Sequence, residues 1–242
     1  MSTSAERVVA IHQPNFFPWL GWFDKFRQAD VFILLDDAQF PKKGGTWINR
    51  VKVLSVDGNA QWMTAPIVRS YNGTREIREI ELDDAQPWRE RITAMLASAY
   101  SGAPHFSETM SLLEDLVAYE ETRLAEFNVN ALNHLLRLLD LSDTQLVRAS
   151  ELNVSATATE RLIDLTRCVG GDCYLAGAGA GGYQDDSAFA AAGITLLEQA
   201  FVPPSYAQGK VDPVQGLSVI DALMHCGAGA TRDMLTGEPP GR

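Results

Sequence analysis

Two apolar runs near the start of the chain enclose a loop that cannot form regular structure. The runs Arg7–His12 and Val31–Leu35 each predict a buried strand. The two prolines of Gln13–Pro18 fix φ and remove backbone donors, and Pro18 suits the first turn of a helix. A strand, a helix and a second strand within about thirty residues predict a right-handed parallel crossover.

Aromatic side chains dominate this first helix and the loop before it. Helical spacing places four of them on one stripe, which predicts burial in the core: Trp19, Trp22, Phe23 and Phe26. Phe16 and Phe17 lie in the loop, where they could belong either to the core or to a stacking surface.

Alternation of strands and helices continues along the rest of the chain. Further strands are expected at 47–54, 61–66, 75–82, 144–147, 172–176 and 194–197. Two or three helices are expected over 87–139, with breaks at 101–104 and near 119, and others at 157–169, 185–192 and 218–225, the last closed by Gly227. This order predicts an α/β fold with a mostly parallel sheet and flanking helices, Rossmann-like, with a central helical insertion at about 87–140. One domain over 7–228 and a flexible tail at 229–242 are expected.

Composition narrows the class of protein. Of 242 residues, 46% are hydrophobic and 21% charged, which excludes disordered, collagen-like and coiled-coil chains. The net charge of −11 disfavours stable binding to nucleic acid or an anionic membrane, because both need a cationic surface. The three cysteines are few and widely spaced, and no stretch is long enough to span a membrane, so a cytoplasmic protein is expected.

Polar residues follow several of the predicted strands. In parallel sheets, ligands bind outside the carboxyl ends of the strands, where His12, Asp36 and Gly177 are expected. His12 could hydrogen-bond a phosphate or move a proton, or it could be a structural histidine. Asp36 and Asp37 could hold a metal or ribose hydroxyls or act as a base, or they could be solvated turn residues.

A local basic cluster stands out in this acidic chain: Lys42, Lys43, Arg50 and Lys52. Together with Trp47 and Asn49 it could bind a phosphate-bearing substrate, or it could be a solvated hairpin.

Other patterns carry less weight. The run Gly177–Gly182 formally matches a dinucleotide fingerprint, but it lies late in the chain and is followed by a short helix. Asp221 and His225 share a helix face, and Cys226 adjoins His225 without facing it. Zinc-ligand spacing, a Walker loop and a nucleophile elbow are absent from the sequence.

Several of these segments together resemble the WbqC-like family, over about residues 8–228. The resemblance rests on Ile11–Lys25 (IHQPNFFPWLGWFDK), Asp36–Phe40 (DDAQF), Trp47–Arg50 (WINR), Tyr174–Gly177 (YLAG), Leu217–Asp221 (LSVID) and His225–Gly227 (HCG).

The resemblance implies a role in bacterial polysaccharide or natural-product biosynthesis. It suggests a transferase that forms an amide bond by moving an acyl or aminoacyl group onto an amine, such as that of an amino sugar. The donor could be an aminoacyl-tRNA, a carrier-protein thioester or an acyl adenylate; the cofactor is undetermined and no metal is expected. His12 would accept the proton, with Asp36 or Asp37 orienting it or the amine. Substrate-binding residues would be Gln13, Asn15, Asp24, Lys25, Gln39, Trp47, Asn49, Arg50, Tyr174, Gly177, Asp221 and His225.

Two other functions stay open. The first strand–loop–helix unit resembles that of the HUP-type nucleotidyltransferases and ligases, although Asn15 stands where their second histidine would be. A nucleotide-dependent ligase or nucleotidyltransferase is therefore one alternative. A non-catalytic module that binds a sugar nucleotide is the other.

Overall fold

The computed structural model describes residues 6–42, 46–177, 185–209 and 212–237. Contacts divide the chain into two compact units, each assembled from three separate segments. Unit 1 comprises Met1–Gln13, Asp24–Asp37 and Leu141–Val202; unit 2 comprises Pro14–Phe23, Ala38–Asp140 and Pro203–Arg242. That residues 7–228 form one domain stays a prediction.

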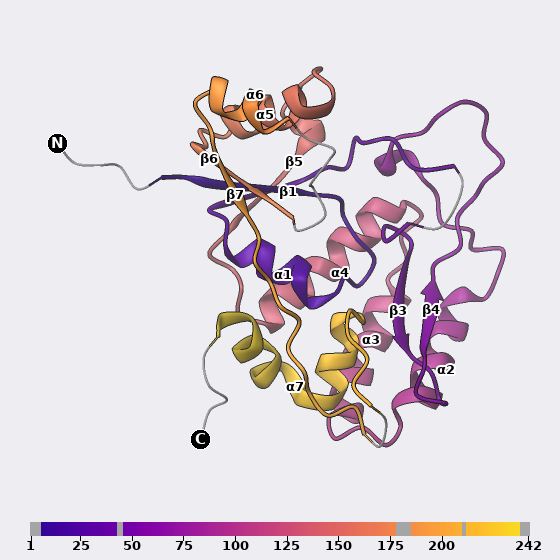
Figure 1. Cartoon of the computed structure of the whole chain (residues 1–242). Coiled ribbons are helices and arrows are strands. Elements are labelled where there is room, and N and C mark those ends of the chain that lie inside the picture. The colour runs from indigo at the N-terminus through magenta and orange to yellow at the C-terminus, as the bar shows by residue number, and fades with distance from the viewer. Residues whose placement is uncertain (1–5, 43–45, 178–184, 210–211, 238–242) are drawn as a thin grey trace. The chain divides into compact units, whose positions relative to one another are not determined.

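Unit 1 contains a five-stranded parallel sheet in the order β5-β2-β1-β6-β7. Figure 1 labels β1, β5, β6 and β7 of this sheet. Its strands are β1 (Val8–His12), β2 (Val31–Leu34), β5 (Gln145–Arg148), β6 (Cys173–Ala176) and β7 (Thr195–Glu198). The α/β fold with a parallel, Rossmann-like sheet is thus confirmed. The near-continuous apolar runs of β1 and β2 follow from burial of both sheet faces.

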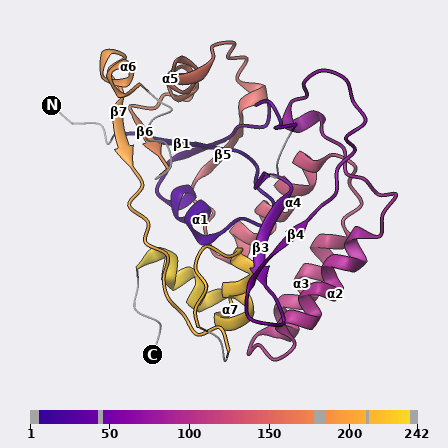
Figure 2. The ribbon, with the colours of Figure 1, turned by 45° about the vertical axis from the view of Figure 1, so that its right-hand side comes forward.

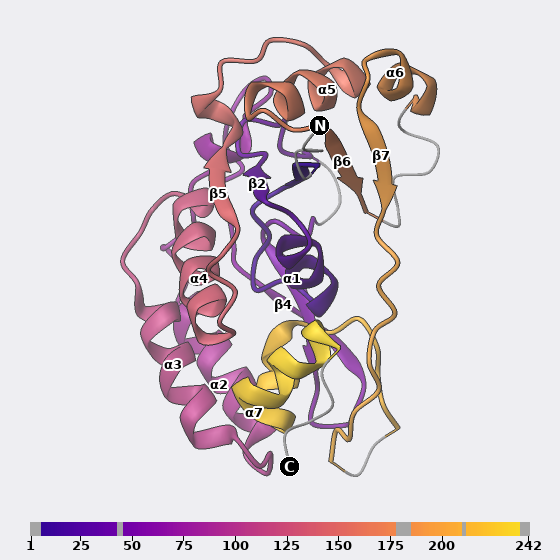
Figure 3. The same ribbon diagram turned by 90° about the vertical axis from the view of Figure 1, so that its left-hand side faces the viewer.

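Helices cover both faces of this sheet. The helices α5 (Ala158–Cys168) and α6 (Asp186–Ala191) lie on one face, against a core that includes Ile11 and Tyr174 (Figure 3). On the other face Phe26, from the second half of α1 (Leu20–Arg27), packs on Phe32 with ring centroids 5.1 Å apart. The short 3₁₀ turn η2 (Ala149–Glu151) follows β5.

The strand order contains a topological switch point between β1 and β6. The chain places β2 and then β5 on one side of β1, and β6 and then β7 on the other. Loops leaving neighbouring strands diverge at such a point, which makes it the usual ligand position in open α/β sheets.

Unit 2 consists mainly of helices and one antiparallel hairpin. The hairpin pairs β3 (Arg50–Leu54) with β4 (Ala60–Thr64), and the helices α2 (Trp88–Tyr100) and α3 (Phe106–Ala118) run side by side (Figure 2). The helix α4 (Leu124–Leu138) completes the predicted helical segment. The strand predicted at 75–82 is wrong: the 3₁₀ turn η1 (Ile77–Glu79) interrupts it, flanked by isolated bridges.

The last helix is longer than the sequence predicted. The helix α7 (Val219–Thr236) continues beyond Gly227, which has φ 76° and ψ 171°, and ends at Gly237. A β-carbon at Gly227 would lie 2.7 Å from the His105 ring, so glycine is needed there for close packing as well as for its backbone angle. Gly227 is therefore a kink inside the helix, and residues 229–236 are helical.

The loop before α1 is held by a buried asparagine in α4. The side-chain amide of Asn128, fully buried, donates to the carbonyl of Pro14 at 2.8 Å and to that of Ile48 at 2.7 Å. Phe16 and Phe17 pack around Phe127, next to Asn128 in sequence, so both loop phenylalanines belong to the core.

The length and hydrophobicity of the helices show whether any of them could span a membrane. Within the described ranges, every helix is too short or too polar to cross a lipid bilayer.

Replacing Asn128 by alanine tests the anchoring of this loop. Two buried carbonyls would lose their donor, so the free energy of unfolding should fall by about 3 kcal/mol. Chemical denaturation measures this change. Asn130→Ala, at a less buried position of the same helix, is the matched control and should cost under about 1 kcal/mol. Equal losses in the two variants would contradict the anchoring role.

Candidate functional site

His12 occupies the carboxyl end of the central strand β1, beside the switch point. Its Nδ1 lies 3.0 Å from the backbone carbonyl of Gln13. Since a carbonyl can only accept, Nδ1 carries the proton and Nε2 carries the lone pair of the neutral ring. The proline-braced loop begins immediately after this contact, which fixes the ring at the end of the strand.

Lys25 reaches the same strand end from α1. Its Nζ donates to the Ile11 carbonyl at 2.9 Å, and the residue is only 4% exposed. Burial lowers the pKa of Lys25 from 10.5 to about 8. A lysine in this environment is partly neutral near physiological pH, which exposed lysines are not.

The opposite side of the switch point contributes β6 and the residue after it. Lys25 Nζ lies 5.9 Å from the ring centroid of Tyr174, and a β-carbon at Gly177 would lie 3.9 Å from the same nitrogen. The structure therefore brings four of the predicted substrate-binding residues together with His12: Gln13, Lys25, Tyr174 and Gly177. Residues 178–182 of the predicted glycine loop lie outside the described residues.

The charge of Lys25 affects the neighbouring His12. Burial and the Lys25 charge lower the pKa of His12 from 6.5 to about 4, against the opposing effect of the Gln13 carbonyl. His12 is therefore neutral at physiological pH, and Lys25 is the stronger base of the two.

Asp24, next to Lys25 on α1, is buried and fully engaged. It accepts from Gln199, after β7, at 2.8 Å and from Gln28 at 2.6 Å, and it pairs with Arg27 at 3.0 Å. These contacts fix the helix against the sheet edge. They indicate a structural role for Asp24.

The paired carboxylates after β2 are each held by a different partner. Both oxygens of Asp36 accept from Ser150, from its backbone N–H at 3.0 Å and its hydroxyl at 2.8 Å. Asp37 pairs with Arg161 of α5 at 2.6 Å. These contacts join the end of β2 to η2 and α5, so a role for either aspartate in catalysis stays a prediction.

The remaining predicted site residues belong to unit 2 and are dispersed within it. Asn15 and Asn49 are buried, and Asn49 donates to the Ala65 carbonyl at 3.0 Å. Gln39 is exposed and bridges to Glu76. Trp47 and Arg50 lie at the start of the hairpin.

Asp221 forms the centre of a buried hydrogen-bond network in unit 2. It accepts from Tyr100 at 2.9 Å, from Tyr206 at 2.8 Å and from Gln208 at 2.7 Å, while Tyr100 accepts from the backbone N–H of Leu54. His225 lies 3.9 Å away. Burial raises the pKa of Asp221 and lowers that of His225. The network ties α2, β3 and the segment before α7 together.

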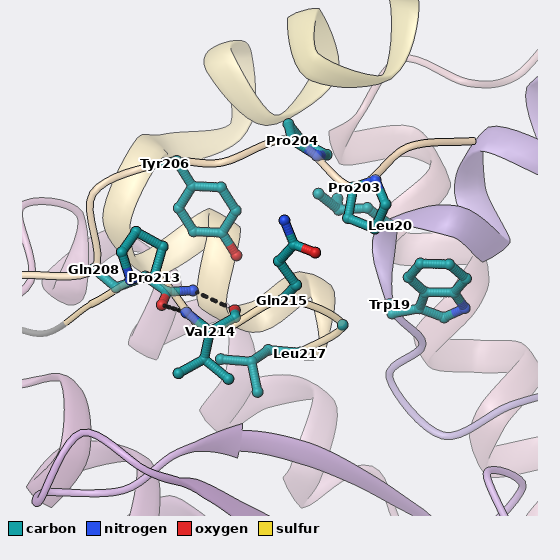
Figure 4. A pocket seen from close by; sticks show the side chains of 11 residues that line it. Trp19, Leu20, Pro203, Pro204, Tyr206, Gln208, Pro213, Val214, Gln215 and Leu217 are labelled. Carbon is teal, nitrogen blue, oxygen red and sulfur yellow. Dashed lines mark hydrogen bonds between the residues drawn. The ribbon is translucent and has the colours of Figure 1, made fainter. Parts of the chain in front are cut away.

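A pocket adjoins this network (Figure 4). Its cavity volume is only about 20 Å³, room for about one water molecule, and it is lined by Trp19, Pro203, Tyr206 and Gln215 among others. Gln208 is held by two hydrogen bonds with the backbone of Val214.

Sequence reasoning missed several of these polar partners. Five of them lie in segments without a recognisable motif, and only their contacts in the structure identify them: Ser150, Arg161, Gln199, Tyr206 and Gln208. Asn128 had a signal, because it interrupts an apolar helical stripe. Among the described residues, no group of three His, Cys, Asp or Glu side chains is placed to hold a metal ion.

Replacing His12 by asparagine tests its lowered pKa. The unfolded chain takes up the proton near pH 6.5 and the folded protein only near pH 4, so acidification between these values destabilises the wild type. Asparagine lacks this titration. The free energy of unfolding of the wild type, minus that of His12→Asn, should therefore fall as the pH drops from 6.5 to 4.

Urea denaturation at several pH values measures this difference. His134→Asn, at an exposed position of α4, should leave the pH dependence of the wild type intact. Parallel curves for the wild type and His12→Asn would show that the pKa of His12 is not lowered.

Comparisons with known proteins agree with the resemblance seen in the sequence. The model of the WbqC-like protein family matches residues 13–233, a range that includes Lys25, Tyr174 and Gly177. The uncharacterized protein Rv1507c of Mycobacterium tuberculosis (strain ATCC 25618 / H37Rv) is 30% identical over 228 residues, 93% of this chain and 96% of that protein. No solved structure matches the chain. The chain belongs to the WbqC-like protein family.

Proposed function

We propose that the protein transfers an acyl or aminoacyl group to the amine of a small molecule, such as an amino sugar. The observation that carries this proposal is the buried Lys25, with its pKa lowered to about 8, at the switch point beside a neutral His12. A base of this strength matches the proton that an amine nucleophile must lose.

The reaction requires one new bond and one proton transfer. The amine nitrogen attacks the acyl carbon, the C–N bond forms, and the bond from that carbon to the leaving group breaks. Neutral Lys25 takes the proton that the amine nitrogen loses, and the leaving group takes it up in turn. The lowered pKa of Lys25 keeps part of it neutral near physiological pH, as this role demands.

His12 has a different role in this proposal. The sequence suggested His12 as the proton acceptor, but a pKa of about 4 makes it a weak base. Its Nδ1 contact with the Gln13 carbonyl fixes the orientation of the ring at the end of β1, where the substrate amine would lie. His12 positions the amine, and Lys25 accepts its proton.

The acyl donor is proposed as a carrier-protein thioester or an acyl adenylate. The net charge of −11 counts against an aminoacyl-tRNA donor, which needs an extended cationic surface. A nucleotide-dependent ligase is the second candidate, because the doubly wound sheet with its switch point between β1 and β6 is an arrangement that binds nucleotides.

An activity assay on Lys25→Met tests the proposal. Methionine has a similar length and lacks both the charge and the base, so the fold should persist while amide formation drops about a hundredfold. The assay mixes acyl thioesters or aminoacyl adenylates with nucleotide-linked amino sugars and detects the amide by mass spectrometry. The wild-type rate should rise with pH through about 8.

Arg78→Met, which removes an exposed cation paired with Glu76, is the control and should keep the wild-type rate and pH profile. His12→Asn should lower the rate while keeping the rise near pH 8. Undiminished amide formation by Lys25→Met would contradict the proposal. Amide formation that requires ATP and releases AMP or ADP would identify the ligase instead.

A further inference from the structure

The hairpin of unit 2 presents two different faces. Strand alternation buries Val51, Val53 and Met63 on one face. The other face carries Arg50 and Lys52 on β3 and Trp62 on β4, with Lys52 directly opposite Trp62. Of the predicted basic cluster, this face therefore carries Arg50 and Lys52, whereas Lys42 Nζ lies 5.8 Å from the ring centroid of Tyr71 and Lys43 lies outside the described residues.

The two cations of this face have no acidic partner among the residues that the structure describes. Within the described part of the chain, neither Arg50 nor Lys52 forms an ion pair, and Arg50 Nε is buried without a hydrogen-bond partner. By contrast, Arg161 pairs with Asp37 and Arg78 with Glu76. In a chain with a net charge of −11, two adjacent unpaired cations attract an anionic ligand.

Two tryptophans accompany these cations at the surface. Trp47 is 44% exposed and Trp62 38% exposed, with ring centroids 5.2 Å apart and planes inclined at 54°. The Arg50 guanidinium lies 4.0 Å from the centroid of Trp62 and Lys52 Nζ lies 5.4 Å from it. Stacking on Trp62 fixes the guanidinium in one orientation before any ligand binds.

We propose that this hairpin face binds a nucleoside diphosphate. The base stacks on Trp47, and the diphosphate is held by Arg50 and Lys52. A simple anion would not contact the exposed tryptophans, and an uncharged sugar would not pair with the two cations. A nucleoside diphosphate can do both. The inference rests on unit 2 alone and does not depend on the proposed acyl transfer.

Binding of UDP and ADP to the full chain, measured by calorimetry, tests this proposal. Both should bind, and both affinities should fall as salt is added. Arg50→Met and Lys52→Met should each weaken binding about tenfold, the loss expected for one charge-assisted contact. Trp47→Leu should weaken UDP about tenfold but leave the weaker binding of pyrophosphate unchanged.

Arg78→Met is the matched control, since it removes one exposed positive charge that is paired with Glu76. It should change the affinity less than twofold. Thermal melts establish that each variant is folded, and Trp47→Phe, which keeps a ring, should retain most of the affinity.

Three results would overturn the proposal. The first is that neither UDP nor ADP binds. The second is that they bind with an affinity that Arg50→Met and Trp47→Leu leave unchanged. The third is that single-stranded RNA or a neutral glycan binds while UDP and ADP do not. Since none of these measurements uses turnover, loss of the acyl-transfer proposal would leave this one standing.

Discussion

The hydrogen bond from Lys25 Nζ to the Ile11 carbonyl is the contact on which the chemistry of unit 1 depends. It brings a cation to the end of the central strand with only 4% of the residue exposed. Burial lowers the pKa of this lysine, and its charge helps to lower that of His12. Burial of the two groups, together with the charge of Lys25 beside His12, therefore produces a neutral imidazole and a lysine that is partly neutral near physiological pH.

The position of α1 makes this contact possible. Neighbouring residues of the helix reach two different strands, since Asp24 binds Gln199 after β7 and Lys25 binds Ile11 of β1. The buried carboxylate of Asp24 is satisfied by three side chains, whereas Lys25 has a carbonyl and an aromatic ring nearby. Asp24 therefore fixes the helix in place. Lys25 has the lowered pKa that a proton acceptor near physiological pH needs.

Unit 2 is organised around buried polar side chains that hold separate segments together. Asn128 and Asp221 each join segments that are distant in sequence through hydrogen bonds that occupy their donors or acceptors. These contacts join distant segments into one fold, and among the described residues only Asn128 Oδ1 of the two side chains is buried without a hydrogen-bond partner. The cations Arg50 and Lys52 differ from them, because they are stacked on an aromatic ring and have no acidic partner among the described residues. That difference is why a ligand is assigned to the hairpin face.

The fold was predictable from the sequence because hydrophobic periodicity is a local property. The apolar runs that became β1 and β2, and the stripe on α4, each identify their element without knowledge of the partner. The end of α7 was not predictable in this way, since Gly227 is a helix stop by local rules although the helix continues after it to Thr236.

The candidate site was predictable only in part. Strand ends indicated His12 and Gly177, and the family resemblance indicated Lys25 and Tyr174. The assignment of the base needed the structure, because the pKa of Lys25 depends on its burial against a strand far from it in sequence. Ser150 and Gln199 could not be found, since their roles come from tertiary contacts alone.

A titration of the lysine side chains by ¹⁵N NMR tests the central claim most directly. The chain contains five lysines, and the signal lost in Lys25→Met identifies Lys25. The account predicts that Lys25 titrates with a pKa of about 8. A pKa near 10.5, the ordinary value for lysine, would contradict it, because Lys25 would then be too fully protonated to accept the proton of an amine.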